Sequence, residues 1–427
     1  MNNLDYNDSN SVQINSHETK GSSMSRITVL GGCGTVGSIA VRTLASLEDF
    51  QEIIIADIDT EKAKKLCTEL EREGISAIRV DALEPQSIKI AIKKSDVVLN
   101  CIGPFFKFAP IILKAVIESG IDYVDVCDDV DATLEILKMN DVAKQANVSA
   151  VIGMGSSPGV ANLLVKFCAD QLLEKIDSID IYHAHGGEPT EGPAVIAHRI
   201  HSMSIPIPMF LDGRLTTVRF FEEDGRALQE DVDFHLLGRF KVYPYPHPET
   251  ITLPRYIPCD RVTNMGCVLP PEYYNLIMDI VNFGLISEQP IDVKGQKITP
   301  LDFTIAFILD QREKILQQTK FGEQRGCLKI VIKGQKAGKP HQYVFSMASR
   351  GQSMGEGTGI PAALGATLMQ RGKIQETGVL PPEACINPLE FLVIMQDALK
   401  FDKIGGEGSP LLFESINAEG NVKRLTL

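Results

Sequence analysis

The sequence has fewer basic than acidic side chains: 42 lysines and arginines against 55 aspartates and glutamates, which gives a net charge of −13. A nucleic-acid surface needs a basic face, so this balance argues against a nucleic-acid partner. The nine cysteines form no Cys-x-x-Cys pair and no tight cluster. This spacing argues against a zinc site or a disulfide framework, and it favours a reducing, cytoplasmic location.

Long uncharged apolar runs are also missing. A membrane span needs about 18 apolar residues, and the best candidate, "FKFAPIILKAVIESG", is interrupted by Lys107, Lys114 and Glu118. We therefore expect no membrane partner. Residues 1–23 lack the basic start and apolar core of a signal peptide and are rich in Asn, Ser and Asp. We expect a disordered leader over residues 1–24, within which Met24 is an alternative start.

The length predicts two domains, because a single hydrophobic core rarely grows to 427 residues. From residue 26 to about 153, six apolar strand-like runs alternate with helix-like segments. This alternation predicts an α/β fold with a doubly wound parallel sheet of the Rossmann type, over residues 25–153. We expect this domain to bind a dinucleotide cofactor.

The stretch "ITVLGGCGTVGS" predicts the phosphate-binding turn. A Gly-x-Gly-x-x-Gly pattern follows a strand and opens a helix. Glycines permit close approach to a pyrophosphate, and a helix N-terminus offers free N–H groups. The predicted cradle consists of Gly32, Gly34, Thr35, Val36 and Gly37.

Asp57 ends the second strand, 20 residues after the last glycine, and is placed to accept the ribose hydroxyls. A carboxylate there would repel a 2′-phosphate, so we predict NAD in preference to NADP. Asp81, at the end of the third strand, is a second cofactor candidate, although it could instead cap the next helix. Three residues at the end of the fourth strand are expected near the nicotinamide or its ribose: Asn100, Gly103 and Pro104. A plain strand-ending turn is the alternative there.

After residue 153 the pattern changes to strands separated by long Pro-rich stretches. We expect an inserted α+β domain over residues 154–348, built on an open antiparallel sheet, for substrate binding and oligomerisation. Residues 349–427 contain a helix of small residues, which suits a segment that packs back against the first domain. The expected assembly is a homodimer.

Four stretches resemble the saccharopine dehydrogenase-like oxidoreductases, which include saccharopine reductases, lysine 6-dehydrogenases and carboxynorspermidine dehydrogenases. They are "GGCGTVGS", "NCIGPFFKFAPIILKAVIESGIDYVDVCDD", "GMGSSPGVANLL" and "GTGIPAALGATLMQRGKI…GVLPPEA". The resemblance implies a Rossmann domain completed by the C-terminal segment, with an inserted substrate domain. It also implies oxidoreduction with NAD or NADP.

The stretch "YVDVCDD" places several carboxylates at the end of the fifth strand. Close carboxylates raise one another's pKa, so we predict that Asp128 is catalytic and that Asp129 binds a substrate amine. Helix N-capping by either residue is the alternative. Phe105, after the preceding strand, is a further candidate substrate contact, and Cys127 is interpreted as a packing residue.

In "IAHRIHSM", His198 and His201 are three apart and share one helix face, next to Arg199. We predict that the histidines transfer protons and that Arg199 holds a substrate carboxylate. Histidines that hydrogen-bond within a helix interface are the alternative, and no metal is expected. Four further arginines of this domain are candidates for the same carboxylate clamp: Arg214, Arg219, Arg239 and Arg255.

Together these patterns predict an NAD(P)-dependent oxidoreductase acting on a carbon–nitrogen bond of a small amino-acid-derived substrate. Two alternatives stay open. One is oxidative deamination of a primary amine, of the lysine 6-dehydrogenase type. The other is a catalytically silent NAD-binding regulatory protein.

Overall fold

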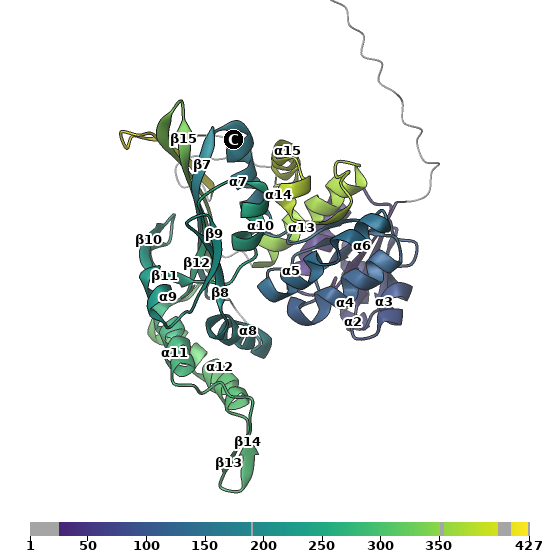
Figure 1. Ribbon diagram of the computed structural model, residues 1–427. Helices are drawn as coiled ribbons and strands as arrows, with labels where there is room; N and C mark the ends of the chain where they lie inside the picture. Colours follow the sequence, from purple (N-terminus) through teal and green to yellow (C-terminus); the bar gives the residue numbers. More distant parts are fainter. Residues whose placement is uncertain (1–24, 189–190, 351–353, 400–410, 426–427) are drawn as a thin grey trace, which may run out of the picture.

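The computed structural model describes residues 25–188, 191–350, 354–399 and 411–425, and the predicted leader lies outside these ranges. The described residues build two large β-sheets that lie side by side, with helices between them, and one small two-stranded sheet (Figure 1). Among the described residues, no helix is long and apolar enough to cross a bilayer. All nine cysteines lie in the described part as free thiols.

The first sheet is wholly parallel, as predicted. Its strands are, in spatial order, β17 (Gly378–Leu380), β6 (Ser149–Val151), β5 (Asp122–Asp125), β4 (Val97–Asn100), β1 (Arg26–Leu30), β2 (Glu52–Asp57) and β3 (Ile75–Arg79). The central strands are almost continuously buried because helices cover both faces. The order reverses between β1 and β4, which is where ligands bind in open sheets of this kind.

Helices cover the two faces of this sheet. One face carries α1 (Thr35–Leu47), α2 (Thr60–Leu70) and α13 (Met354–Gln370). The other carries α3 (Pro85–Ala91), α4 (Phe105–Glu118), α5 (Val130–Leu137) and α6 (Asn140–Gln145). The C-terminal part thus supplies both an edge strand, β17, and a covering helix, α13. Gly359 permits that helix to lie close to α1, because a Cβ there would come within 2.6 Å of the Val36 carbonyl oxygen.

The second sheet is mixed, and this corrects the expectation of an antiparallel one. Its strands are β10 (Glu230–Phe234), β11 (Gly238–Pro244), β12 (Arg261–Leu269), β7 (Lys175–Gly186), β15 (Arg325–Lys336), β16 (Lys339–Arg350), β18 (Leu411–Ile416) and β19 (Val422–Leu425), with β8 (Ile207–Leu211) and β9 (Arg214–Val218) branching from β12. β7 and β12 are parallel, since the long intervening segment forms a crossover.

Helices also cover both faces of the second sheet. The face toward the first domain carries α7 (Val160–Gln171), α10 (Glu249–Tyr256), α14 (Pro382–Cys385) and α15 (Pro388–Leu399). The opposite face carries α8 (Pro193–Ser204), α11 (Pro271–Asn282) and α12 (Pro300–Gln318), and the short α9 (Glu223–Ala227) lies near β11. One apolar core runs from Ile55 of β2 through Leu164 of α7 to Ile181 of β7. The two domains are therefore fused through a shared core.

A small hairpin extends from the far end of the second domain, formed by β13 (Ile291–Val293) and β14 (Gln296–Ile298) (Figure 1). With the adjoining ends of α11 and α12 it forms a projection over residues 282–307, which we call the arm. Large apolar side chains are exposed along it: Phe283, Leu285, Ile291, Val293, Phe303 and Phe307.

Candidate active site

In the glycine turn after β1, one glycine has no room for a side chain, whereas another has free space beside it. A Cβ at Gly37 would lie 2.1 Å from the Gly31 carbonyl oxygen, so a side chain there is excluded. At Gly34 the nearest atom would be that same oxygen at 3.3 Å. Gly34 is also the N-cap of α1 and provides no side-chain cap, so the first N–H groups of the helix are left for a ligand. These features fit a pyrophosphate.

Gly31 was missed by the motif reading, yet it makes the turn. Its φ of +71° lies in the left-handed region that favours glycine. Its N–H donates to the Ala56 carbonyl at 2.8 Å, which joins the turn to β2. The double glycine in "LGGCG" is the signal that could have identified it.

Asp57 lies beside this turn, at the end of β2. Its carboxylate accepts hydrogen bonds from the Cys33 N–H at 3.2 Å and from the Asp59 N–H at 3.1 Å. The nearby cation Lys62 pairs with Asp59 at 3.3 Å rather than forming an arginine or lysine site next to Asp57. The partly exposed Asp57 carboxylate therefore lies beside the turn, where it can accept further hydrogen bonds from a ligand.

Asp81 does not cap the next helix, since the N-cap of α3 is Glu84. Instead the Asp81 carboxylate accepts from the Leu83 N–H at 3.1 Å. Leu83 and Ile58 follow neighbouring strands and are 58% and 62% exposed. Two exposed apolar side chains at this edge suit the faces of an adenine ring.

A buried hydrogen-bond chain lies at the ends of β4 and β5. The Asn100 amide donates to the Tyr123 hydroxyl, which donates to Asp125, each at 3.0 Å. Asp125 also accepts from the Gly153 N–H at 2.8 Å. Burial raises the pKa of Asp125 to about 6 although these hydrogen bonds oppose the shift. The Asn100 side chain is thus hydrogen-bonded within the protein. Any effect of Asn100 on a cofactor would be indirect, through the position of the end of β4.

The turn after β4 carries Gly103 and Pro104, joined by a cis peptide bond. A Cβ at Gly103 would meet nothing within 4 Å, so this turn borders open space where a nicotinamide can approach. Phe105 differs from its expected role, because its side chain packs into the apolar cores. The next residue, Phe106, is 51% exposed and lines the pocket instead.

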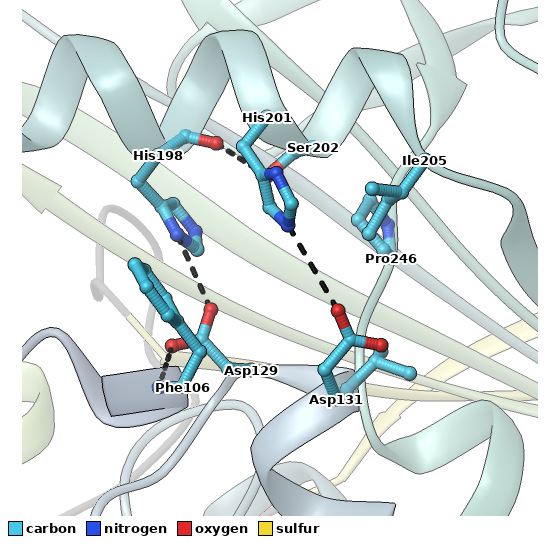
Figure 2. A pocket seen from close by; sticks show the side chains of 9 residues that line it. Phe106, Asp129, Asp131, His198, His201, Ser202, Ile205 and Pro246 are labelled. Atoms are coloured by element: carbon cyan, nitrogen blue, oxygen red, sulfur yellow. Dashed lines mark hydrogen bonds and ion pairs between the residues drawn. The ribbon is translucent and has the colours of Figure 1, made fainter. Parts of the chain in front are cut away.

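Asp129 and His198 face each other across the cleft between the domains (Figure 2). The Asp129 carboxylate lies 3.2 Å from His198 Nδ1 and also accepts from the Phe106 N–H at 3.0 Å. Asp129 stands at the N-cap of α5, but its side chain makes no capping bond. The capping alternative is therefore not realised by this carboxylate.

Each partner of this pair changes the pKa of the other. Burial opposes ionisation of both, but the hydrogen bond and the mutual attraction outweigh it. The pKa of Asp129 is lowered, and the pKa of His198 is raised. One turn further along α8, His201 lies 3.9 Å from Asp131 and contacts the ring of Phe106. The spacing on one helix face thus brings both histidines to one pocket, which Phe106, Asp129 and Asp131 also line.

Asp128 lies next to the pair and is only partly exposed. Burial raises its pKa and the charge of Asp129 adds to the effect, while His198 opposes it. The neighbouring Cys127 is buried, and burial together with the nearby carboxylates holds the pKa of its thiol well above the usual range. This environment fits the interpretation of Cys127 as a packing residue.

Arg199 faces away from the pocket, which differs from its predicted role at a substrate carboxylate. Successive helix residues point about 100° apart, so His198 and Arg199 cannot share a face. The Arg199 guanidinium is buried and pairs with Glu191 at 2.7 Å, and Arg312 pairs with the same carboxylate at 3.0 Å. The Tyr273 hydroxyl also donates a hydrogen bond to the Glu191 carboxylate. The arginine on which the carboxylate clamp depended is therefore paired within the protein, where it shares Glu191 with Arg312.

The other four clamp candidates are not brought together. They lie on β9, after β9, on β11 and on α10: Arg214, Arg219, Arg239 and Arg255. The second of them approaches Glu222 at 3.7 Å, and the third approaches Asp231 at 3.8 Å. In the described chain these four arginines therefore lie on different elements and do not form one clamp.

Sequence reasoning missed a second polar group in the cleft, on the segment between β11 and α10. His247 Nδ1 lies 2.7 Å from Glu249 Oε2, and the Ser157 hydroxyl donates to the other oxygen of Glu249. The segment "YPYPHPET" reads as an irregular Pro-rich loop, and the histidine and glutamate two residues apart within it were the available signal. Ser157 lies in the loop after β6, so this chain of hydrogen bonds joins that loop to the start of α10.

This arrangement defines a class of protein: a two-domain oxidoreductase whose Rossmann-type sheet meets acid–base side chains of a mixed-sheet domain. Residues 27–151 match the family model described as saccharopine dehydrogenase NADP binding domain. Residues 155–400 match the one described as saccharopine dehydrogenase C-terminal domain. The chain therefore belongs to the saccharopine dehydrogenase family, and the resemblance seen in the sequence is confirmed.

Characterised relatives cover nearly the whole chain at low identity. The carboxyaminopropylagmatine dehydrogenase of Synechocystis sp. is 24% identical over 387 residues, covering 86% of this chain and 94% of the relative. The carboxynorspermidine synthase of Vibrio cholerae is 25% identical over 402 residues, covering 85% and 93%. The fold is similar to that of the saccharopine dehydrogenase (L-Glu forming) from Saccharomyces cerevisiae, with a TM-score of 0.64, 16% identity and coverage of 94% of this chain and 100% of the other.

Proposed function

We propose that this protein is an NAD(P)-dependent oxidoreductase that interconverts an amine and an imine at a carbon–nitrogen bond of an amino-acid-derived substrate. The observation that carries the proposal is the Asp129–His198 pair. Asp129 is hydrogen-bonded to the Phe106 N–H, directly after the Gly103–Pro104 turn that borders the expected nicotinamide position. An acid–base pair thus lies next to the place where hydride would be transferred.

The bound nicotinamide supplies or accepts the hydride. In the oxidative direction the carbon loses hydride, the nitrogen loses a proton, and a C=N bond forms. Asp128 is the proposed acceptor of that proton, because its environment favours the protonated carboxyl more than that of Asp129 does. Asp129 holds Nδ1 of His198, so Nε2 is the nitrogen that can exchange a proton with the substrate.

The cleft favours a substrate that carries positive charge. Its first-domain wall presents Asp129 and Asp131, with Asp128 next to them in the chain, whereas Arg199 is turned away and paired with Glu191. We therefore propose a substrate with more than one amine nitrogen, such as the carboxyalkyl polyamine-type compounds that the names of the two relatives denote. This favours a secondary amine over the primary amine of a lysine 6-dehydrogenase type reaction.

The proposed cofactor is NAD, although the matching family model is described as NADP-binding. The Asp57 carboxylate occupies the position where a 2′-phosphate would lie, and the nearby Lys62 is paired with Asp59. A carboxylate at that position favours ribose hydroxyls over phosphate.

The test is a panel of carboxyalkyl amines, amino acids with their imine precursors, and 2-hydroxy acids, measured by NADH and NADPH absorbance. We expect turnover on amines or imines, and a fall of roughly 10²- to 10⁴-fold in kcat for His198→Asn. His341→Asn is the matched control, because that histidine is hydrogen-bonded to Ser415 at 2.8 Å on a strand away from the cleft. Turnover confined to hydroxy acids would refute the proposal, and cofactor binding without any turnover would favour the silent regulatory alternative.

We also propose that the chain forms a homodimer through the arm. Phe283 is 80% exposed and Phe303 is 58% exposed. Large aromatic side chains carry on the order of 150–250 Å² each, so the arm's six apolar side chains expose on the order of 500 Å². That is a large share of the roughly 800 Å² that each partner buries in a stable interface. A Phe283→Lys/Phe303→Lys variant should elute as a monomer in light-scattering chromatography, and an unaltered protein that is monomeric would overturn this assembly.

A further inference from the structure

A second histidine–aspartate contact crosses the cleft beside the Asp129–His198 pair. His201 Nε2 lies 3.9 Å from the Asp131 carboxylate, and the two contacts stand next to each other in one pocket (Figure 2). The Asp129–His198 contact is the closer of the two, at 3.2 Å, and Asp129 is also held by the Phe106 N–H. The proposed function uses this closer contact, and it assigns no particular group of the substrate to Asp131.

The contact between His201 and Asp131 is loose. Its 3.9 Å exceeds a hydrogen-bond distance, and the two side chains are 49% and 63% exposed. An exposed ion pair of this kind contributes little to stability. Among the residues that the structure describes, no lysine or arginine pairs with Asp131. The imidazole can therefore turn aside for a ligand cation without breaking a hydrogen bond to this carboxylate.

Phe106 adds an aromatic ring at the same position. It is a half-exposed residue, and its ring centroid lies 6.1 Å from that of His201. A cation held where the His201 ring now lies is thus at about the 6 Å distance within which an aromatic face attracts a positive charge. The adjacent Lys107 does not fill this position, because its ammonium lies over the Phe108 ring at 5.2 Å. A free carboxylate beside an exposed aromatic ring suits an ammonium group.

The spacing of the two contacts describes the ligand further. His198 and His201 are three residues apart on α8, so their Cβ atoms lie about 5–6 Å apart. In an extended alkyl chain with single bonds of about 1.5 Å, roughly three or four methylenes place two nitrogens at that separation. The pocket lining also includes apolar residues that suit such methylenes: Val130, Ile205 and Pro246. The pocket therefore matches two amine nitrogens joined by a short alkyl chain.

We propose that Phe106 and Asp131 form a subsite for a second ammonium group of the substrate, about three or four methylenes from the nitrogen that reacts beside Asp129 and His198. On binding, this ammonium takes the place of the His201 imidazole at the Asp131 carboxylate. The subsite rests on the proposed function, and it separates a diamine-derived substrate from an amino acid that has one nitrogen. Asp131 is then a specificity-determining residue and takes no part in hydride or proton transfer.

The experiment measures kcat/KM of the full-length protein for two series of carboxyalkyl amines, at about 0.15 M salt so that distant charges are screened. One series ends in a second amine after a varied number of methylenes, and the other ends in a methyl group instead. We expect the unaltered protein to prefer the diamine series, most strongly at about three or four methylenes. Asp131→Asn and Phe106→Leu should each lower this preference about two- to fivefold, which is the size of exposed ionic and cation–π contacts.

Glu135→Gln is the matched control for the loss of charge. Glu135 is exposed on the same helix, α5, pairs with Lys138 at 2.6 Å and does not line the pocket. A general electrostatic effect would change the preference equally in Glu135→Gln and in Asp131→Asn, whereas we expect the control to keep it. If amines are turned over but Asp131→Asn keeps the preference too, or both variants lose it equally, the subsite is overturned while the proposed function stands.

Calorimetric titration gives a readout that does not depend on turnover. Propane-1,3-diamine and propylamine are titrated into the full-length protein saturated with NAD or NADP. The diamine should bind more tightly, and Asp131→Asn should reduce the difference. If no amine or imine is turned over, the proposed function fails, and tighter diamine binding that depends on Asp131 still supports the subsite. Equal affinities of the two amines, or no measurable binding of either, overturn it.

Discussion

The glycine turn and the interdomain cleft place their functional groups in different ways. The turn is built from one continuous stretch, Gly31–Gly37, and needs only the end of β2 to complete it. The cleft collects side chains from the ends of β4 and β5, from α8 and from the segment before α10. Backbone N–H groups serve the first site, whereas paired ionised side chains form the second. The glycine turn should therefore tolerate side-chain changes outside its glycines. The cleft depends instead on how the two domains pack against each other.

The largest effect should come from closing the open position of the turn. Gly34→Val puts a branched side chain where the pyrophosphate is proposed to bind, and the nearest protein atom to its Cβ is 3.3 Å away, so the fold should survive. We expect a loss of at least about 100-fold in affinity for both NADH and NADPH by calorimetric titration. Gly37→Ala is the contrasting variant, since its Cβ would collide with backbone at 2.1 Å and should unfold the domain. Tight binding by the valine variant would place the cofactor elsewhere.

An effect of similar size, on the stability of the fold and not on cofactor affinity, should come from the ion pairs behind the cleft. Glu191→Gln leaves Arg199 and Arg312 buried without their shared counter-charge. Breaking a buried ion pair in this way costs about 3–5 kcal/mol, to be measured by urea unfolding. Asp231→Asn breaks the exposed contact with Arg239 and should cost less than about 1 kcal/mol. Equal costs for the two variants would mean that Glu191 is not the buried anchor of α8.

Cofactor preference should respond to one carboxylate. Asp57→Asn removes the charge beside the ribose and keeps an acceptor for the Cys33 N–H. We expect the affinity for NADPH relative to NADH to rise about tenfold, which is about 1.4 kcal/mol. Fluorescence titration of both nucleotides measures this ratio. A ratio that already favours NADPH in the unaltered protein would refute the assignment of NAD.

The smallest effect is the pH dependence of the Asp129–His198 pair. Asp129, with its lowered pKa, stabilises the fold above the ordinary range of aspartate, and this contribution is lost as the pH falls through the lowered value. His198, with its raised pKa, stabilises below the ordinary range of histidine, and this is lost as the pH rises through the raised value. The pair should therefore stabilise most between roughly pH 4 and 6.5.

Comparison of the unaltered protein with His198→Asn checks this window. Because His198 is partly exposed, we expect a difference of about 1 kcal/mol near pH 6 and almost none at pH 9. Chemical denaturation across this pH range gives the two values. A constant difference would indicate a packing contribution instead of an ionic one.

The sequence predicts what depends on local pattern. The parallel sheet, the glycine turn and the common face of His198 and His201 follow from periodicity and spacing, and the structure agrees with each. Arg199 shows where that reasoning ends: its position on the helix was predictable, but its pairing with Glu191 depends on tertiary packing. The His247–Glu249–Ser157 chain could not be predicted as a unit, because its serine lies 92 residues from its glutamate in the sequence. The parallel pairing of β7 with β12 could not be predicted either, because these strands are also far apart in the sequence.

The return of the C-terminal part to the first sheet has a consequence for synthesis on the ribosome. The nascent first domain emerges with the edge of β6 unpaired and the face of α1 uncovered, because α13 and β17 are translated long after α1 and β6. At about 5–20 residues per second, the roughly 230 residues between Val151 and Leu380 take some tens of seconds to make. Throughout that interval an open strand edge and an apolar helix face are available to chaperones, and a ribosome stalled before Gly378 would hold an incomplete nucleotide-binding domain.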